Sequence, residues 1–261
     1  MHARTPARCA LFVLLATVFV LPLRAQYVCE PGNGPLNSAA PAGITPSEII
    51  ETFATHEAAL GAARDRYAYT LDVTVETLNG SFVNGSFHQV SEVGVSDHGQ
   101  RIERMTFAPQ STLRGLGITK DDLDDIRDRL PMVLKAQELS LYSISYAGQQ
   151  RVDQLDTYVF DVAAKDPKKA PGRFRGRVWV EARDLVIVKT CGKTGSDENG
   201  GSLGKNTANL MPTFVTYREQ IDGKYWFTTY ARAEEVLNFP RGGVHMREVV
   251  KYSNYKSPAA K

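Results

Sequence analysis

The histidine and acidic side chains of this chain are the ones whose types could bind a metal ion. Four histidines follow residue 25, and none stands in an H-x-x-x-H or H-x-H pair: His56, His88, His98 and His245. The acidic run DDLDD at residues 121–125 lacks the glycine and the terminal glutamate of a calcium loop. Acids in a first helical turn also complement the helix dipole. We therefore expect no metal site and no cofactor.

Motifs for phosphate binding and catalysis are incomplete. The stretch GGSLGKN at residues 200–206 has Asn199 where a P-loop needs its first glycine, and Asn206 where it needs serine or threonine. No G-x-S-x-G nucleophile elbow occurs, and no pair of carboxylates stands out as general acid and base. We expect no catalytic residues. A hydrolase whose Ser-His-Asp set assembles only in space is an alternative.

The first 25 residues have the features of a cleaved secretory signal peptide. Arg4 and Arg8 precede a continuous apolar run over residues 10–21, and Ala25 fits the position before the cleavage site. The run is too short to span a bilayer comfortably, and an uncleaved membrane anchor is the alternative. No later segment has the roughly 18 apolar residues of a transmembrane helix. We expect an exported protein, periplasmic or extracellular, without a transmembrane segment in the mature chain.

The charge of the chain gives no reason to expect a nucleic acid partner. Removal of residues 1–25 takes away three arginines and no acid, so the formal net charge changes from +2 to −1. The basic character therefore belongs to the export signal, and not to a surface that would attract nucleic acid or anionic lipid.

Two cysteines remain after signal removal, Cys29 and Cys191. In an oxidising compartment a lone pair predicts one disulfide, with free thiols as the alternative. Lipidation of Cys29 is disfavoured because residues 26–28 lack the small side chains that precede a lipidated cysteine. No C-x-x-C redox motif occurs.

Residues 26–44 are rich in proline, glycine, alanine and asparagine and are typical of a flexible linker.

Two helices are predicted after this linker. Thr45-Pro46-Ser47-Glu48 is a capping box with proline at the first helical position, and apolar residues then recur at helical spacing to about Arg64. A second short helix is predicted over residues 119–130, capped by Thr119 and ended by Pro131.

The rest of the chain alternates with period two and predicts strands. Asn79-Gly80, Asn84-Gly85 and Asp222-Gly223 are typical of tight turns. Consecutive hairpins favour one large antiparallel sheet, which curls as its twist accumulates. We predict a β-dominated α+β fold, with the two helices packed on or in the concave face of the sheet. The expected strands cover residues 67–76, 87–95, 101–107, 139–146, 157–163, 174–181, 185–190, 213–220, 225–237 and 244–255.

Two stretches resemble the outer-membrane lipoprotein-sorting-like superfamily, which includes the carrier LolA, its receptor LolB and the lipid-binding protein LppX. The hairpin GRVWVEARDLVIVKT at residues 176–190 is similar to the family's glycine–tryptophan hairpin, with Glu181 where aspartate is usual. The stretch TFVTYREQIDGKYWF at residues 213–227 is similar to a later family segment, in which proline is usual where this chain has Phe227 and Thr228. The residues of this chain that match the later segment are Tyr217, Asp222, Gly223 and Trp226.

The resemblance implies an unclosed β-barrel over residues 45–256, followed by a disordered tail at residues 257–261. It also implies a helical lid over an apolar cavity. A lipid chain gains about 0.8 kcal/mol per buried CH₂ group, so a carrier needs such an interior. The predicted function is that of an exported, monomeric, non-catalytic binding protein for a lipid or lipoprotein acyl chain. The residues expected to line the cavity are Tyr69, Leu71, Val73, Tyr158, Phe160, Val178, Val180 and Phe227.

The same side chains could instead pack directly on the first helix as an ordinary core. In that case the alternative function is an envelope protein-interaction or stress-sensing module, which would bind a protein partner through an apolar patch on its outside.

Overall fold

The computed structural model describes residues 29, 31–96, 98–131, 134, 136–166, 173–194, 212–239 and 242–258. The predicted signal peptide, the glycine-rich stretch 200–206 and residues 259–261 of the predicted tail lie outside these ranges. The described helices are α1 (Pro46–Arg64), α2 (Lys120–Asp128) and a short 3₁₀ helix, η1 (Ala136–Leu141). The described strands are β1 (Asn33–Asn37), β2 (Ala68–Asn79), β3 (Phe82–Val95), β4 (Arg101–Phe107), β5 (Tyr142–Val152), β6 (Leu155–Ala164), β7 (Phe174–Glu181), β8 (Ile187–Thr194), β9 (Phe214–Ile221), β10 (Tyr225–Phe239) and β11 (Gly242–Lys256).

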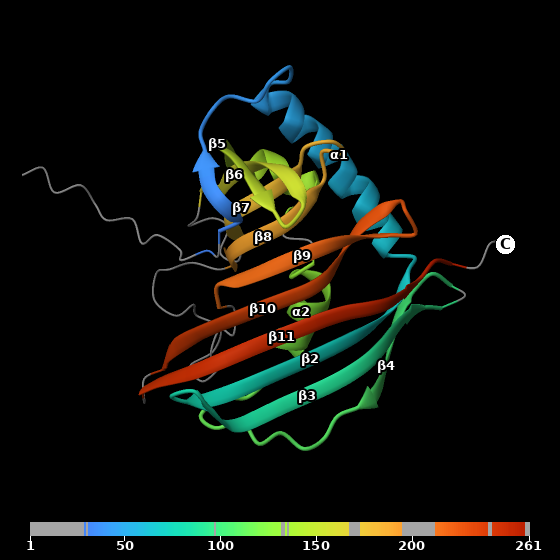
Figure 1. Ribbon diagram of the computed structural model, residues 1–261. Helices are drawn as coiled ribbons and strands as arrows, with labels where there is room; N and C mark the ends of the chain where they lie inside the picture. The colour runs from blue at the N-terminus through green and yellow to red at the C-terminus, as the bar shows by residue number, and fades with distance from the viewer. Residues whose placement is uncertain are drawn as a thin grey trace, which may run out of the picture.

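These strands form one antiparallel sheet in the order β1-β5-β6-β7-β8-β9-β10-β11-β2-β3-β4 (Figure 1). Strands β5 to β11 are neighbours in chain order, and β2 pairs with β11. The sheet is curled and not closed, because β1 and β4 end the strand order at opposite edges. The predicted fold class, a large curled antiparallel sheet with two α-helices, is confirmed.

Both helices begin at the predicted N-cap residues, Thr45 and Thr119, and the structure shows a capping box at each. The backbone N–H of Thr45 donates to Glu48 Oε2 at 2.8 Å, and that of Thr119 donates to Asp122 Oδ2 at 2.8 Å. In each box the threonine hydroxyl accepts in return from the backbone N–H of the acidic residue, which satisfies amide groups that lack intrahelical partners.

The two helices pack on the same face of the sheet. Ile49 and Phe53 of α1 share one buried core with Ile126 of α2 and with side chains from β2, β6, β7, β10 and β11. In Figure 1, α2 lies behind β10 and β11, while α1 extends past the ends of β8 and β9. We call this helix-covered side the concave face and the other side the convex face.

Part of the predicted linker is a strand. Residues Asn33–Asn37 form β1, which pairs with β5 at the sheet edge. The side chain of Gln150 fixes this segment, because it accepts from Gly32 N–H at 2.9 Å and donates to the Gly34 carbonyl at 2.8 Å. The composition of residues 26–44 did not indicate this strand, since its hydrogen-bond partners lie more than 100 positions away in the sequence.

The segment before β1 crosses the convex face and is fastened there. A disulfide joins Cys29 to Cys191 on β8, the pairing that the two remaining cysteines predicted. Lys189 is 2% exposed, donates to the Pro31 carbonyl at 2.9 Å and lies over the ring of Trp179 at 4.9 Å. Cys191 and Trp179 belong to a second, smaller core on this face.

One predicted turn is wrong. Asn79-Gly80 lies where β2 ends and Gly80 forms the turn before β3, but Asn84-Gly85 lies inside β3. A Cβ atom on Gly85 would lie 2.4 Å from the Thr112 carbonyl oxygen, because the segment after β4 folds back and Thr112 N–H donates to the Ser86 carbonyl at 2.8 Å. This glycine therefore permits a close backbone approach and makes no turn.

The disulfide spans 162 positions, so we expect it to contribute strongly to stability. In the chain-entropy account, closing a loop of this length contributes on the order of 5 kcal/mol. The double variant Cys29→Ser/Cys191→Ser should unfold about 10 °C below the unmodified protein, as measured by calorimetry. A reducing agent should lower the unfolding temperature of the unmodified protein and leave that of the double variant unchanged. Equal unfolding temperatures for the two proteins in oxidising buffer would contradict the role given to the disulfide.

Candidate functional site

The first helix is fixed to the sheet by a buried ion pair. Glu57 of α1 and Arg218 of β9 each have side chains only 1% exposed. Arg218 Nη2 donates to Glu57 Oε2 at 3.0 Å and to the Pro131 carbonyl at 3.2 Å, and Nη1 donates to the Ile187 carbonyl at 3.3 Å. One guanidinium group thus links α1, β8, β9 and the segment after α2.

The second helix covers the concave face with few apolar side chains. Ile126 is the one buried residue of α2, and Leu130 follows it into the core. Polar contacts complete the attachment: Tyr252 OH donates to the Ile126 carbonyl at 2.6 Å, and Arg127 pairs with Glu103 of β4 at 2.9 Å. A helix of nine residues is marginal in water by itself, so the position of α2 depends on these contacts.

The residues predicted to line a cavity lie on or beside the concave face. Six of them belong to the main core: Tyr69, Leu71, Val73, Phe160, Val178 and Val180. Tyr158 packs against the rim of that core, and Phe227 belongs to a separate cluster with Leu60, Ala63 and Tyr67 at the end of α1. None of them lines either of the two described cavities. Their role in ligand binding stays a prediction.

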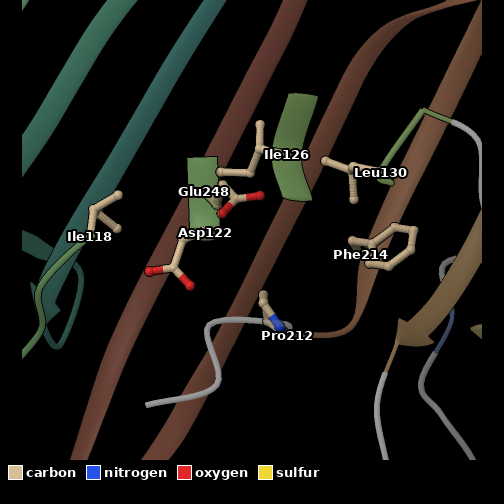
Figure 2. Close-up of a pocket in the computed structure, with 7 residues that line it drawn as sticks. All are labelled: Ile118, Asp122, Ile126, Leu130, Pro212, Phe214 and Glu248. Atoms are coloured by element: carbon tan, nitrogen blue, oxygen red, sulfur yellow. The ribbon is translucent and has the colours of Figure 1, made fainter. Parts of the chain in front are cut away.

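A small pocket lies between α2 and the sheet (Figure 2). Its volume is about 10 Å³, which is room for at most one water molecule. The sheet contributes Phe214 and Glu248, α2 contributes Asp122 and Ile126, and the remaining lining residues are Ile118, Leu130 and Pro212. Figure 2 shows the Glu248 carboxyl group among Asp122, Ile126 and Phe214. The concave face is therefore closed in this structure.

Glu248 is a buried acid without a compensating cation. Only 5% of it is exposed, and its neighbours across the sheet are Ala233 on β10 and Val75 on β2. Its carboxylate has no hydrogen bond or ion pair within the described part of the chain. Burial, and then the negative charge of Asp122, raise the pKa of Glu248 from 4.5 to about 7. The carboxylate is thus placed where ionisation is costly.

The alternation of residues along β11 is the sequence signal that marks Glu248. Met246, Glu248, Val250 and Tyr252 alternate along β11, and the other three point into the main core. A charged residue on the apolar face of a strand is uncommon and marks a special environment.

A second cavity lies against β9, β10 and β11, and its lining includes Ala233 and Glu248 as well as residues of the convex face. Its volume is about 270 Å³. Its lining includes Tyr230, Arg232, Glu234 and Arg247, and Arg247 Nε lies 2.9 Å from Glu234 Oε2. A lining of charged groups is unsuited to an aliphatic chain, because burying them would remove their hydration.

Metal-binding and membrane-spanning features are absent from the described residues. They contain no group of three or more histidine, cysteine, aspartate or glutamate side chains placed to hold a metal ion. Within the same residues, no helix has both the length and the apolar composition needed to cross a membrane.

No protein-family model matches this chain, and no curated protein matches it in sequence. It is similar to solved structures at low identity. A DUF1329 family protein from Desulfovibrio piger is 16% identical with a TM-score of 0.37, over 80% of this chain and 95% of that one. A LolA superfamily protein from Nitrosomonas europaea is 12% identical with a TM-score of 0.37, over 84% and 96%.

A putative outer-membrane lipoprotein-sorting protein domain from Vibrio parahaemolyticus is 10% identical with a TM-score of 0.37, over 81% of this chain and 94% of that one. The resemblance to lipoprotein-sorting-like proteins is thus found in the structure as well as in two sequence stretches, and it is weak. At these TM-scores it says nothing about function.

Breaking the Glu57–Arg218 pair on one side should destabilise the fold strongly. Glu57→Gln or Arg218→Met leaves an uncompensated buried charge or polar group, and each variant should lose about 3–5 kcal/mol of unfolding free energy in urea titrations. The double variant Glu57→Leu/Arg218→Met should lose clearly less than the sum of the single losses. Strict additivity of the two losses would show that the pair does not act as a unit.

The buried acid predicts an unusual dependence of stability on pH. The folded state retains the Glu248 proton up to about pH 7 and the unfolded state only to about pH 4.5, so this group's contribution to stability is greatest below pH 4.5 and falls as the pH rises to 7. The total fall is on the order of 3 kcal/mol. The main charged group facing it is Asp122, and the facing residues of β2 and β10 are apolar.

Urea unfolding of the Glu248→Gln variant tests this dependence. The variant should be more stable than the unmodified protein at pH 8, and the difference should disappear near pH 4. Glu51→Gln, at an exposed position of α1, is the matched control and should show no such difference. A stability gain in Glu248→Gln that is equal at both pH values would contradict the raised pKa.

Proposed function

We propose that this protein is an exported, non-catalytic carrier for an apolar ligand, a lipid or lipoprotein acyl chain, which enters the concave face when α2 moves away. The observation that carries the proposal is the apolar character of that face beneath a short, acidic helix. In the closed conformation described above, α2 then conceals an interior that would otherwise be exposed to water.

The apolar surface beneath α2 is extensive. Side chains of β2, β9, β10 and β11 belong to one continuous core beneath the helix, among them Val73, Val75, Phe214, Met246 and Val250. An aliphatic chain laid on these strands would replace the contacts that Ile126 and Leu130 now make.

Of the two helices, α2 is the one suited to move. The 19-residue helix α1 buries several side chains and holds the Glu57–Arg218 pair, whereas α2 buries Ile126 and carries four aspartates in its first six residues. Three of these aspartates are engaged locally: Asp122 caps the helix, Asp124 pairs with Lys120 and Arg127, and Asp125 pairs with Arg129. These acids therefore contribute little to the attachment of α2 to the sheet. Burial and the charges of neighbouring aspartates also raise the pKa of Asp125.

A protein-interaction module is the second candidate, favoured by exposed apolar side chains at one sheet edge. Phe82 on β3 is 79% exposed, and β4, the edge strand of the described sheet, exposes Ile102, Met105 and Phe107 by 50% or more. An edge strand with exposed apolar residues can accept an extended segment of a partner as an additional strand.

The carrier proposal predicts that weakening the docking of α2 strengthens ligand binding. Ile126→Ala removes the buried side chain of α2, which should cost about 2–5 kcal/mol of docking free energy and raise the population of the open state. Titration with N-phenyl-1-naphthylamine, an uncharged fluorescent probe of apolar sites, should therefore give a lower apparent Kd for this variant than for the unmodified protein. Ile49→Ala, the same truncation on α1, is the matched control and should not lower the Kd.

Native mass spectrometry of the protein purified from its own cell envelope gives an independent test. A carrier should retain an acyl species at a near one-to-one ratio, which organic extraction would then identify. A ligand-free mass, together with no N-phenyl-1-naphthylamine binding by any variant, would contradict the carrier proposal and favour the interaction module.

A further inference from the structure

The pocket beneath α2 contains a charge that nothing in the described chain neutralises. Glu248 is nine-tenths or more buried, lines the pocket and has no hydrogen bond to the described residues. The charged group that acts on it, Asp122, has the same sign. Asp122 is engaged at the helix start, where its carboxylate accepts from Thr119. A second carboxylate cannot neutralise the first, so among the described residues no cation offsets the charge of ionised Glu248.

We propose that this pocket binds the ammonium group of a cationic amphiphile whose aliphatic chain lies on the apolar concave face. The inference rests on the proposed carrier function and names the class of ligand: an amine with a long hydrocarbon chain. The occupant would supply the positive charge that the described residues do not provide at this place.

The surroundings of Glu248 favour an ammonium group over other headgroups. An ammonium group has three N–H donors and no acceptor, which suits a place whose polar groups are the carboxylates of Glu248 and Asp122. A phosphate or carboxylate headgroup would be repelled by both acids. An alcohol or ester would leave the Glu248 carboxylate without a counter-charge in an apolar environment.

The apolar lining then provides the place for the chain. Ile118, Ile126, Leu130 and Phe214 surround the two acids, and Ala233 and Val75 flank Glu248 on the sheet. The present volume of about 10 Å³ admits no hydrocarbon chain, so binding requires the displacement of α2 that the proposed function already includes.

Isothermal titration calorimetry at pH 8 with three probes of equal chain length tests the inference. The probes are dodecylammonium, 1-dodecanol and dodecanoate, each used below its micelle concentration. The unmodified protein should bind dodecylammonium at least about tenfold more tightly than 1-dodecanol, as expected for one charge-assisted contact in a buried site. Dodecanoate should bind most weakly.

Glu248→Gln should reduce the preference for dodecylammonium over 1-dodecanol to about twofold or less. This variant keeps the size of the side chain and removes a buried charge, so it is expected to fold. Glu51→Gln is the control, because it makes the same change in net charge on the exposed surface of α1 and should leave the preference intact.

The possible outcomes distinguish a failure of the carrier function from a failure of the amine inference. If no probe binds, the carrier function itself fails. If 1-dodecanol binds as tightly as dodecylammonium, or if Glu248→Gln keeps the preference, the carrier function stands and the amine inference is overturned. A preference that Glu248→Gln loses and Glu51→Gln retains would support the inference.

Discussion

The buried ion pair between Glu57 and Arg218 determines which parts of this protein are fixed. The two residues are 161 positions apart, and Arg218 also donates to carbonyls on β8 and at Pro131. A buried guanidinium group needs several acceptors at defined positions, so the pair sets the position of α1 relative to the sheet. The buried side of α1 is therefore held against the core of the sheet. The remaining part of the concave face is covered by α2, which is held by hydrogen bonds from Tyr252 and Arg64 to its carbonyls and by the Arg127–Glu103 pair. That pair is less buried than the pair between Glu57 and Arg218.

The two faces of the sheet are closed in different ways. On the convex face, a disulfide and the buried Lys189 fasten the N-terminal segment, and Trp179 Nε1 donates to the same Gln150 side chain that fixes β1. On the concave face, the cover over β10 and β11 is a short helix held by side chains. Opening the convex face would require breaking a covalent bond, whereas α2 is held only by non-covalent contacts. For the proposed carrier, this difference favours ligand entry on the concave side of the sheet.

Much of the fold could be predicted from the sequence because its signals are local. Both capping boxes, the strands 101–107 and 174–181, and the order of hairpins depend on neighbours within a few residues. The features that were missed depend on distant contacts: β1 needs Gln150, and Gly85 needs Thr112 to approach its backbone. Asn79-Gly80 and Asn84-Gly85 are the same dipeptide in different roles. The candidate site could be predicted only in part. The alternation of residues along β11 indicates that Glu248 faces the core, but no local pattern indicates that α2 covers it.

A charge without a partner beneath a movable helix suits a binding protein better than a rigid core does. A carrier must shield its apolar interior from water in the absence of ligand. The free energy needed to expose that interior to a ligand must be small. A chain of twelve carbons gains on the order of 9 kcal/mol from burial, which must exceed the free energy that displacing the cover requires. Burying the Glu248 charge reduces the stability of the closed state, and does so most above the pH at which this acid loses its proton. An occupant that carries the missing positive charge would relieve that cost and fill the interior in the same step.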